Sequence, residues 1–157
     1  MLATKGTVKR DYTTALIRDF AGDCDVMLVS ASKLAGYAEA ALHGLPVADA
    51  DLRAEIEPAF VEKGGRRTDR VVLACTHYPL LVPVLRRLLP DGIRLVDSAT
   101  TCAEHLKQEL QRLDMFNPQK GEGTLEIHLT DLSEEFETLA RRFLSKPSGR
   151  IQRAVLA

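Results

Sequence analysis

Residues 70–79 read Arg-Val-Val-Leu-Ala-Cys-Thr-His-Tyr-Pro, and a largely apolar segment continues to residue 89. The first five residues form a short run rich in β-branched side chains, which predicts a strand covered on both faces. Pro79 and Pro83 are compatible with a turn and a first helical turn, where a missing backbone N–H costs little. Because Pro90 and Gly92 then end the pattern, the stretch predicts a strand, a tight turn and a helix.

This arrangement would place Cys75 where its side chain can react with a bound ligand. The residue would lie at the carboxyl end of a strand and face the amino end of a helix, where open α/β sheets bind their ligands. A helix amino end favours an anion, either a carboxylate or a thiolate. His77 is close enough to exchange a proton with this thiol, and Thr76 offers a hydroxyl and an N–H to a carboxylate. Position alone leaves a second interpretation open, because most free cysteines are small buried hydrophobes.

The amino-acid sequence of this stretch resembles a motif of a known enzyme family. Ala-Cys-Thr-His-Tyr-Pro after an apolar strand, followed by Leu-Val-Asp-Ser-Ala at residues 95–99, resembles the second catalytic cysteine motif of glutamate racemases. These enzymes belong to the cofactor-independent aspartate/glutamate racemase superfamily. Relatives that act on aspartate usually place an acidic residue at the position of His77, so the motif favours glutamate. The resemblance implies an isomerase without a cofactor, in which Cys75 and His77 are catalytic and Thr76 and His77 contact substrate.

Racemisation explains why such a site needs a thiol. The reaction removes the Cα proton from one face and returns a proton to the other, so two acid/base groups must flank the carbon. Cysteine suits this work because an ordinary thiol pKa near 8.5 can be tuned towards neutrality. In the family the first cysteine lies in a Cys-Asn-Thr segment, and an Asp-Ser pair near the amino terminus also holds substrate. Neither occurs here as a free-standing motif, so we expect a carboxyl-terminal portion that is inactive alone.

Composition excludes several other classes. The 157 residues suffice for one domain, and 45% hydrophobic with 27% charged residues is typical of a soluble globular protein. A formal charge of −1, from 21 basic and 22 acidic residues, gives no electrostatic case for nucleic acid or an anionic membrane. No apolar run reaches the roughly 18 residues of a membrane span. Three cysteines without close pairing argue against a disulfide framework and for a reducing, cytoplasmic location.

The rest of the chain alternates between strand and helix signals, which predicts an α/β fold with a mostly parallel sheet flanked by helices. The predicted strands are residues 1–3, 26–29, 70–74, 94–96 and 125–130. The predicted helices are residues 8–20 with Ala15, Leu16 and Phe20 on the buried face, 31–42, about 49–60 with Asp49 or Asp51 as cap, 80–89, 101–113 and about 133–144. Residues 63–67 are predicted to form a solvated polar loop.

The resemblance also implies a domain organisation of two pseudo-symmetric lobes. Residues 1–96 would be the second lobe, which carries the Cys-Thr-His motif, and residues 97–144 a returning segment that completes the first lobe. Residues 145–157 would be a flexible tail. An Ala-Thr-x-Gly-Thr turn at residues 3–7 also occurs in the family, which implies substrate contact by Thr4 and Thr7. The alternative, that these hydroxyls only cap a turn, stays open.

Other candidates are weaker. Glu39 aligns loosely with an acidic residue near the family's active site, but we favour a solvated helix face because the preceding residues depart from the family pattern. Cys24 and Cys102 are interpreted as structural. A zinc site is not supported, because no Cys-x-x-Cys or His-x-x-x-His spacing is present.

The resemblance implies a glutamate racemase that supplies D-glutamate for peptidoglycan synthesis and thereby contributes to cell shape. Two other functions are alternatives. One is a non-catalytic short form that binds a ligand or partner, and the other is a related racemase with another substrate. The family also implies a small-molecule substrate and a homodimer.

Overall fold

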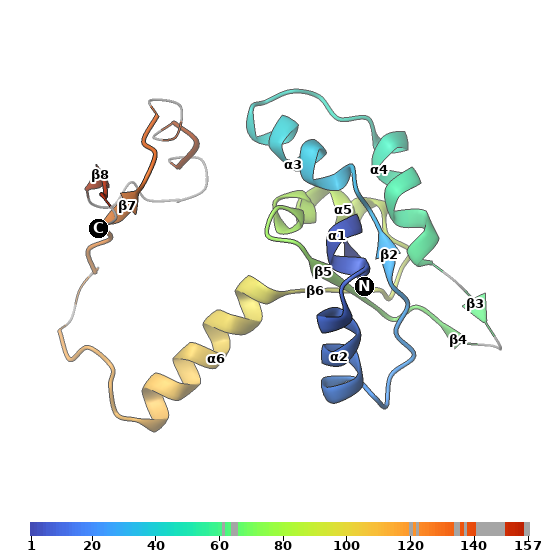
Figure 1. Cartoon of the computed structure of the whole chain (residues 1–157), viewed down its shortest axis with the longest axis horizontal. Helices are drawn as coiled ribbons and strands as arrows, with labels where there is room; N and C mark the ends of the chain where they lie inside the picture. The colour runs from blue at the N-terminus through green and yellow to red at the C-terminus, as the bar shows by residue number, and fades with distance from the viewer. Residues whose placement is uncertain are drawn as a thin grey trace. The chain divides into compact units, whose positions relative to one another are not determined.

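The structure is a computed structural model that describes residues 1–60, 62–63, 66–119, 121, 123–133, 136, 138–140 and 150–155. The chain divides into two compact units, Met1–Leu113 and Asp114–Ala157. The first unit is built on a parallel four-stranded sheet of order β2-β1-β5-β6 (Figure 1). Its strands are β1 (Leu2–Ala3), β2 (Val29–Ser30), β5 (Arg70–Ala74) and β6 (Arg94–Asp97). The predicted α/β architecture with a parallel sheet is therefore confirmed.

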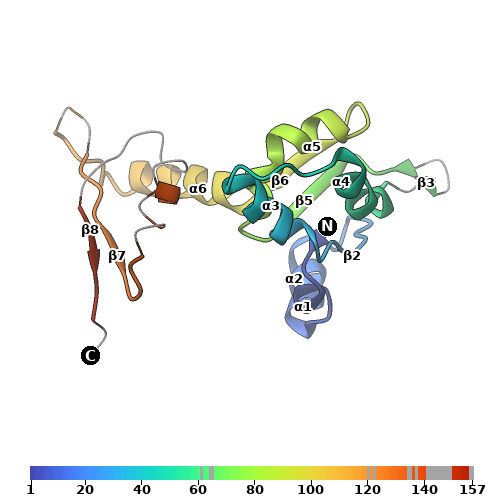
Figure 2. The same ribbon diagram turned by 90° about the horizontal axis from the view of Figure 1, so that it is seen from above.

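Helices lie on both sides of this sheet (Figure 2). On one side are α3 (Leu34–Leu42), α4 (Asp49–Ile56) with the 3₁₀ turn η1 (Glu57–Ala59), and the 3₁₀ turn η2 (Tyr78–Leu81) continuing into α5 (Val82–Leu88). On the other side are α1 (Lys5–Val8) and α2 (Asp11–Phe20). The unit also contains the antiparallel pair β3 (Glu62–Lys63) and β4 (Arg66–Arg67), and helix α6 (Ser98–Arg112).

The hydrophobic core fills the space between the sheet and the first group of helices. Its fully buried side chains come from β1, β5 and each of the covering elements: Leu2, Leu34, Leu52, Ile56, Val71, Leu73, Tyr78, Leu81 and Leu85. Burial of this many large apolar side chains is the main stabilising contribution to a domain of this size. The core therefore fixes η2, and with it the turn that follows Cys75, against the sheet.

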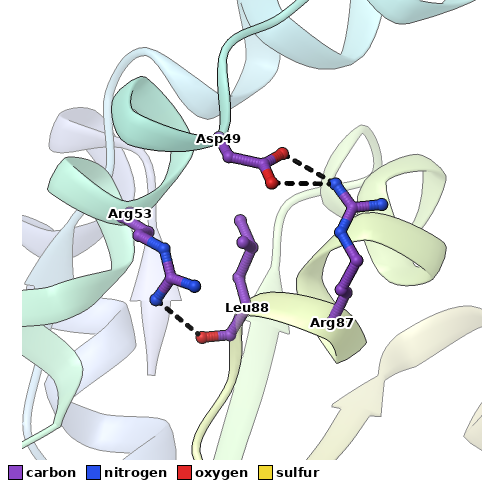
Figure 3. Close-up of polar contacts among 4 residues, drawn as sticks. All are labelled: Asp49, Arg53, Arg87 and Leu88. Carbon is purple, nitrogen blue, oxygen red and sulfur yellow. Dashed lines mark hydrogen bonds and ion pairs between the residues drawn. The ribbon is translucent and has the colours of Figure 1, made fainter.

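Polar contacts join α4 to α5 at the rim of this core (Figure 3). Arg87 donates from Nη2 to both carboxylate oxygens of Asp49, at 2.7 and 3.0 Å. Arg53 reaches the carbonyl of Leu88 from Nη1 at 3.5 Å. The predicted capping role of Asp49 or Asp51 is wrong, because the N-cap is Ala48 and makes no side-chain bond. Asp49 lies in the first turn instead and turns its carboxylate to the neighbouring helix.

The prediction that strand β5 is covered on both faces is wrong for one of the two faces. Val71 and Leu73 are each 1% exposed, whereas Val72 between them is 39% exposed. Val72 pairs with Val96 of β6, so the two side chains share the face opposite the core. Since α1 and α2 connect β1 to β2, they cover those strands, and β5 and β6 lack an equivalent helix on that face within the described residues.

The predicted helix 8–20 corresponds to α2, which begins at Asp11 after the separate helix α1, and its expected buried face is largely exposed. The chain leaves α1 at Lys9 and enters α2 at Asp11, and the hydroxyl of Thr13 donates to the Thr7 carbonyl at 2.7 Å. Thr13 is the buried residue of α2, while Leu16 and Phe20 are exposed and Ala15 is half-buried. Periodicity identified the apolar stripe correctly but could not tell whether another element covers it.

Four further elements differ from prediction. Strand β2 is limited to Val29–Ser30, and residues expected as a polar loop form β3 and β4. Helix α6 begins at Ser98, three residues early, because Asp97 caps it by accepting from the Thr100 N–H at 2.9 Å. None of the residues of α6 is buried.

The second unit contains β7 (Ile127–Leu129), which lies in the predicted strand 125–130, and β8 (Ile151–Arg153). The two strands pair in parallel, with Ile127 opposite Ile151. Residues 151–153 of the predicted tail form β8, whose backbone bonds to β7, and the flexibility of the tail stays a prediction. Residues 145–149 lie outside the described residues, as does most of the predicted helix ending at Leu144. No helix in the described part of the chain has the length and apolar content needed to span a bilayer.

Candidate functional site

Three parallel strands end side by side where the candidate residues gather. In the register of the sheet, Ala3 of β1 lies between Ser30 of β2 and Ala74 of β5. Thr4 and Cys75 are the residues that directly follow the ends of β1 and β5. The structure therefore brings the Thr4 turn, which lies far away in sequence, next to the Cys75 turn at the carboxyl edge of the sheet, where parallel α/β proteins bind ligands.

A thiol, an imidazole and a carboxylate form a row at this edge. The Sγ atom of Cys75 lies 4.0 Å from Nδ1 of His77, and the Nε2 atom of the same ring lies 3.4 Å from Oε1 of Glu39. The Thr76 hydroxyl lies 3.5 Å from Nδ1 of His77. The two ring nitrogens thus face opposite partners, which suits an imidazole that is oriented by one group and exchanges a proton with the other.

The interpretation of Glu39 as part of a solvated helix face is incomplete. Its side chain is 62% exposed, as expected for a solvated helix face, but its carboxylate also faces His77. The contact joins α3 to the turn after β5, and no local sequence pattern reveals a pair this distant. The loose alignment with an acidic family residue was the available signal.

The Thr4 turn has the geometry of a helix cap. The hydroxyl oxygens of Thr4 and Thr7 lie 3.0 Å apart, and the Thr7 N–H donates to Thr4 Oγ1 at 3.4 Å. Thr4 is the N-cap of α1. Both side chains are partly buried, and Thr4 follows the end of β1 directly. Capping is therefore observed, and a ligand contact by the same hydroxyls stays a prediction.

A further pair of hydroxyls lies at the end of the neighbouring strand. Ser30 and Ser32 are exposed, and their Oγ atoms are 3.1 Å apart. Sequence reasoning noted this segment only as a departure from the family pattern. Its position directly at the end of a strand was the signal that could have placed it at the same sheet edge.

Tyr78 lies behind the row and is completely buried. Its hydroxyl donates to the carbonyl of Ala31, the residue after β2, at 2.7 Å. Burial raises the pKa of Tyr78 to about 12, with smaller contributions from Cys75 and Glu55. The phenol therefore stays a neutral donor at physiological pH. The ring of Tyr78 packs in the hydrophobic core.

The other two thiols, which were interpreted as structural, both lie in exposed positions. Cys24 precedes β2, and the charge of Asp23, whose Oδ1 atom lies 3.6 Å from the sulfur, raises the pKa of this thiol. Cys102 lies on α6. Within the described residues, no group of three or more histidine, cysteine or acidic side chains could hold a metal ion.

A shallow cavity of about 260 Å³ occurs at the opposite end of the sheet. Its lining includes Asp69, which precedes β5, and Ile93, which precedes β6, so it opens at the amino ends of these strands. Its position separates it from the Cys75 turn, which lies at the carboxyl end of β5.

The open parallel sheet defines the class of the first unit as α/β, with acid/base groups at the edge where parallel α/β proteins bind ligands. No protein-family model matches the chain. A glutamate racemase of Brucella ovis is 53% identical over 110 residues, which are 70% of this chain and 40% of that protein. A glutamate racemase of Rhizobium meliloti is 48% identical over 122 residues, 78% of this chain and 44% of that protein.

Solved structures agree with these relatives. Escherichia coli glutamate racemase, in complex with L-glutamate and the activator UDP-MurNAc-Ala, has a TM-score of 0.74 at 32% identity and covers 99% of this chain. A Bacillus anthracis glutamate racemase isoform has a TM-score of 0.80 at 21% identity, which shows the fold. The chain is a homologue of glutamate racemases, and it spans about two fifths of the length of the curated relatives it matches.

Proposed function

We propose that this chain forms one acid/base side of a cofactor-independent glutamate racemase site. The observation that carries the proposal is the row of Cys75, His77 and Glu39 at the carboxyl edge of the sheet. The named relatives and the glutamate-bound E. coli structure support glutamate as the substrate.

Cys75 would act at one face of the substrate Cα atom. In one direction its thiolate takes the Cα proton, so that the C–H bond breaks, an S–H bond forms and the electron pair moves into the α-carboxylate. A second acid/base group then returns a proton to the opposite face. In the other direction the Cys75 thiol delivers the proton. His77 would hold the proton that leaves the thiol, and Glu39 would stabilise the imidazolium that results.

The hydroxyls around the row would hold the substrate. Thr76 lies beside His77, and Thr4 with Thr7 lies at the end of the adjacent strand, so hydrogen bonds from these groups can reach a carboxylate placed over the edge. Residues 1–96 would constitute one lobe of the racemase. Residues 97–144 would return to the other lobe, which is supported by a helix α6 without buried residues. The second acid/base group would come from that other lobe.

A chimaera tests the proposal directly. The chain is joined to the part of the Brucella ovis racemase that it does not span, and conversion of L-glutamate to D-glutamate is followed by circular dichroism. Cys75→Ala should abolish racemisation, because one face then lacks its proton donor and acceptor, whereas the control Cys24→Ser should retain it. Near-normal turnover of the Cys75→Ala chimaera would refute the acid/base role of Cys75. The chain without its complement should release no Cα proton to D₂O.

The cellular role we propose is supply of D-glutamate for peptidoglycan in the cytoplasm, by a racemase that can form a homodimer. Expression of the chimaera in a strain that requires D-glutamate should restore growth without the supplement. The Cys75→Ala chimaera should fail to do so. Growth with both versions would show that rescue does not depend on this chemistry.

A further inference from the structure

The carbonyl of Ala31 is a meeting point of three elements. It accepts the hydroxyl of Tyr78 at 2.7 Å and the N–H of Leu34, the first residue of α3, at 3.3 Å. The N–H of Ala31 donates to the carbonyl of Ala3, the last residue of β1, at 2.9 Å. All four residues are buried. The bonds therefore join the turn after β5, the start of α3 and the end of β1 in a dry environment, where hydrogen bonds hold geometry tightly.

These bonds close a ring that passes through the proposed active site. Tyr78 directly follows His77, and α3, which starts at the Ala31 turn, carries Glu39. The carboxylate of Glu39 returns to the imidazole of His77 at 3.4 Å. The hydroxyl of Tyr78 thus joins the helix that carries the carboxylate to the turn that carries the imidazole.

The Glu39–His77 contact, at the exposed side of this ring, depends on the buried hydrogen bonds at Ala31. The side chains of Glu39 and His77 are 62% and 41% exposed, so they gain little energy from each other and cannot hold α3 in place. Their distance of 3.4 Å is also near the limit for a hydrogen bond, and a small shift of α3 would break it. The position of α3 must be set by buried groups, and Tyr78 of η2 supplies a buried side-chain hydrogen bond to Ala31, whose carbonyl also accepts from the first residue of α3.

We propose that Tyr78 is a positioning residue: its hydroxyl, through Ala31, sets the distance between Glu39 and His77 and thereby the reactivity of the Cys75 thiol. This inference rests on the proposed function, which makes Cys75 the reacting group. The phenol is suited to the task because it stays protonated at neutral pH and its ring is packed in the core.

The reactivity of Cys75 towards iodoacetamide measures this coupling. Alkylation rates are determined at pH 7 by mass spectrometry of the peptides, with exposed Cys24 as the internal reference, for the full 157-residue chain. Glu39→Gln should slow alkylation of Cys75 about threefold, the effect expected from loss of one exposed ion pair. Tyr78→Phe, which keeps the ring and removes the hydroxyl, should slow it by a similar factor. Tyr37→Phe, a hydroxyl deletion on α3 itself, is the matched control and should leave the rate unchanged.

The double variant Tyr78→Phe/Glu39→Gln distinguishes positioning from a general structural effect. If Tyr78 acts through Glu39, the double variant should react as slowly as Glu39→Gln and no slower. An unchanged rate in Tyr78→Phe, or effects of the two substitutions that multiply, would overturn the inference. The alkylation rates of Tyr78→Phe and of the parent are compared at equal folded fraction, so that the difference reports the hydroxyl and not a change in stability.

A second variant keeps the inference testable if Tyr78→Phe does not fold. Glu55 accepts from the backbone N–H of Lys33 at 3.0 Å and so holds the same turn from the side of α4. Glu55→Ala loosens this turn without entering the core. It should slow alkylation of Cys75 by a smaller factor in the parent and not in the Glu39→Gln background. An equal effect in both backgrounds would refute transmission through Glu39.

The alkylation rates of Cys75 can be measured whether or not the chimaera racemises glutamate. Coupled alkylation rates with an inactive chimaera would retain the positioning role and refute the proposed function. An active chimaera with uncoupled rates would retain the function and refute the positioning role.

Discussion

The two faces of the parallel sheet in the first unit differ sharply although the same strands form both. On one face, Val71 and Leu73 pack beneath α3, α4 and α5 and are almost inaccessible to solvent. On the other, Val72 is 39% exposed, and the apolar side chains of α2 point largely to solvent. Hydrophobic side chains thus occur on both faces, but the large buried ones of β5 lie on only one of them.

This contrast locates the source of both the stability and the chemistry of the unit. Burial stabilises in proportion to the apolar area removed from water, so the face under α3–α5 should dominate the free energy of folding. The same layer positions η2 and α3, which carry the groups of the candidate site. The four predictions below test this asymmetry, beginning with the largest effect.

Neighbouring residues of β5 give the most direct test. Leu73→Ala should lower the free energy of unfolding by about 2–5 kcal/mol, because it removes buried methyl groups and leaves a cavity. Val72→Ala should cost less than about 1 kcal/mol, because its side chain is already partly hydrated. Urea denaturation followed by far-ultraviolet circular dichroism measures both. Equal losses would show that the second face is covered in solution.

Alkaline pH should weaken the covered face through Tyr78. Its pKa is raised from 10.0 to about 12 in the folded chain, so its stabilising contribution is complete below pH 10 and is lost as pH rises towards 12. The free energy of unfolding should fall over this window by up to about 1.4 kcal/mol per pH unit. Tyr78→Phe should remove this slope, and Tyr12→Phe, at an exposed position, should keep it. A slope that persists in Tyr78→Phe would assign it to other groups.

Helix α6 has no buried residue, so its end groups should matter more than its side-chain packing. Hydrogen bonds from Thr100 and Ala99 lower the pKa of Asp97, so its capping contribution is complete above the ordinary aspartate pKa. That contribution should be lost as pH falls through the lowered value. Asp97→Ala should destabilise α6 by about 1 kcal/mol, seen as a smaller helical signal, while Asp97→Asn should retain a cap and lose the pH dependence. An unchanged signal in Asp97→Ala would contradict this role.

The smallest effect is expected at the exposed rim between α4 and α5. The pair of Asp49 and Arg87 is exposed, so Arg87→Ala should cost less than about 1 kcal/mol and should cost less still in high salt. A double-mutant cycle with Asp49→Asn isolates the pair from the packing of the arginine stem. A coupling as large as the loss in Leu73→Ala would mean that the rim, and not the core, holds the two helices together.

Local chemistry explains which parts of the fold could be predicted. Pro79 and Pro83 permit only a turn and a helix start, and Gly92, with φ of 86°, ends the connection to β6, so the strand-turn-helix around Cys75 was predictable. The exposure of Val72 and Phe20 was not predictable, because it depends on which strands the connecting helices join and therefore on which face they cover.

The candidate site shows the same limit. The positions of Cys75 and His77 followed from one short motif, since both lie in the turn that the motif encodes. The approach of Glu39 to His77 depends on the register of β2, β1 and β5 and on the placement of α3. A contact of this kind is a product of the whole sheet, and the sequence carries no local record of it.

The pairing of Leu2 with both Val29 and Leu73 also has a consequence for the order of folding. Strand β1 is central in the sheet, but its second partner follows about 70 residues later in the chain, and such distant pairings form slowly. During synthesis at roughly 5–20 residues per second, β1 would wait several seconds for β5 to emerge. The Thr4 turn and the Cys75 turn would therefore meet only late, so that reactivity develops after most of the local structure has formed.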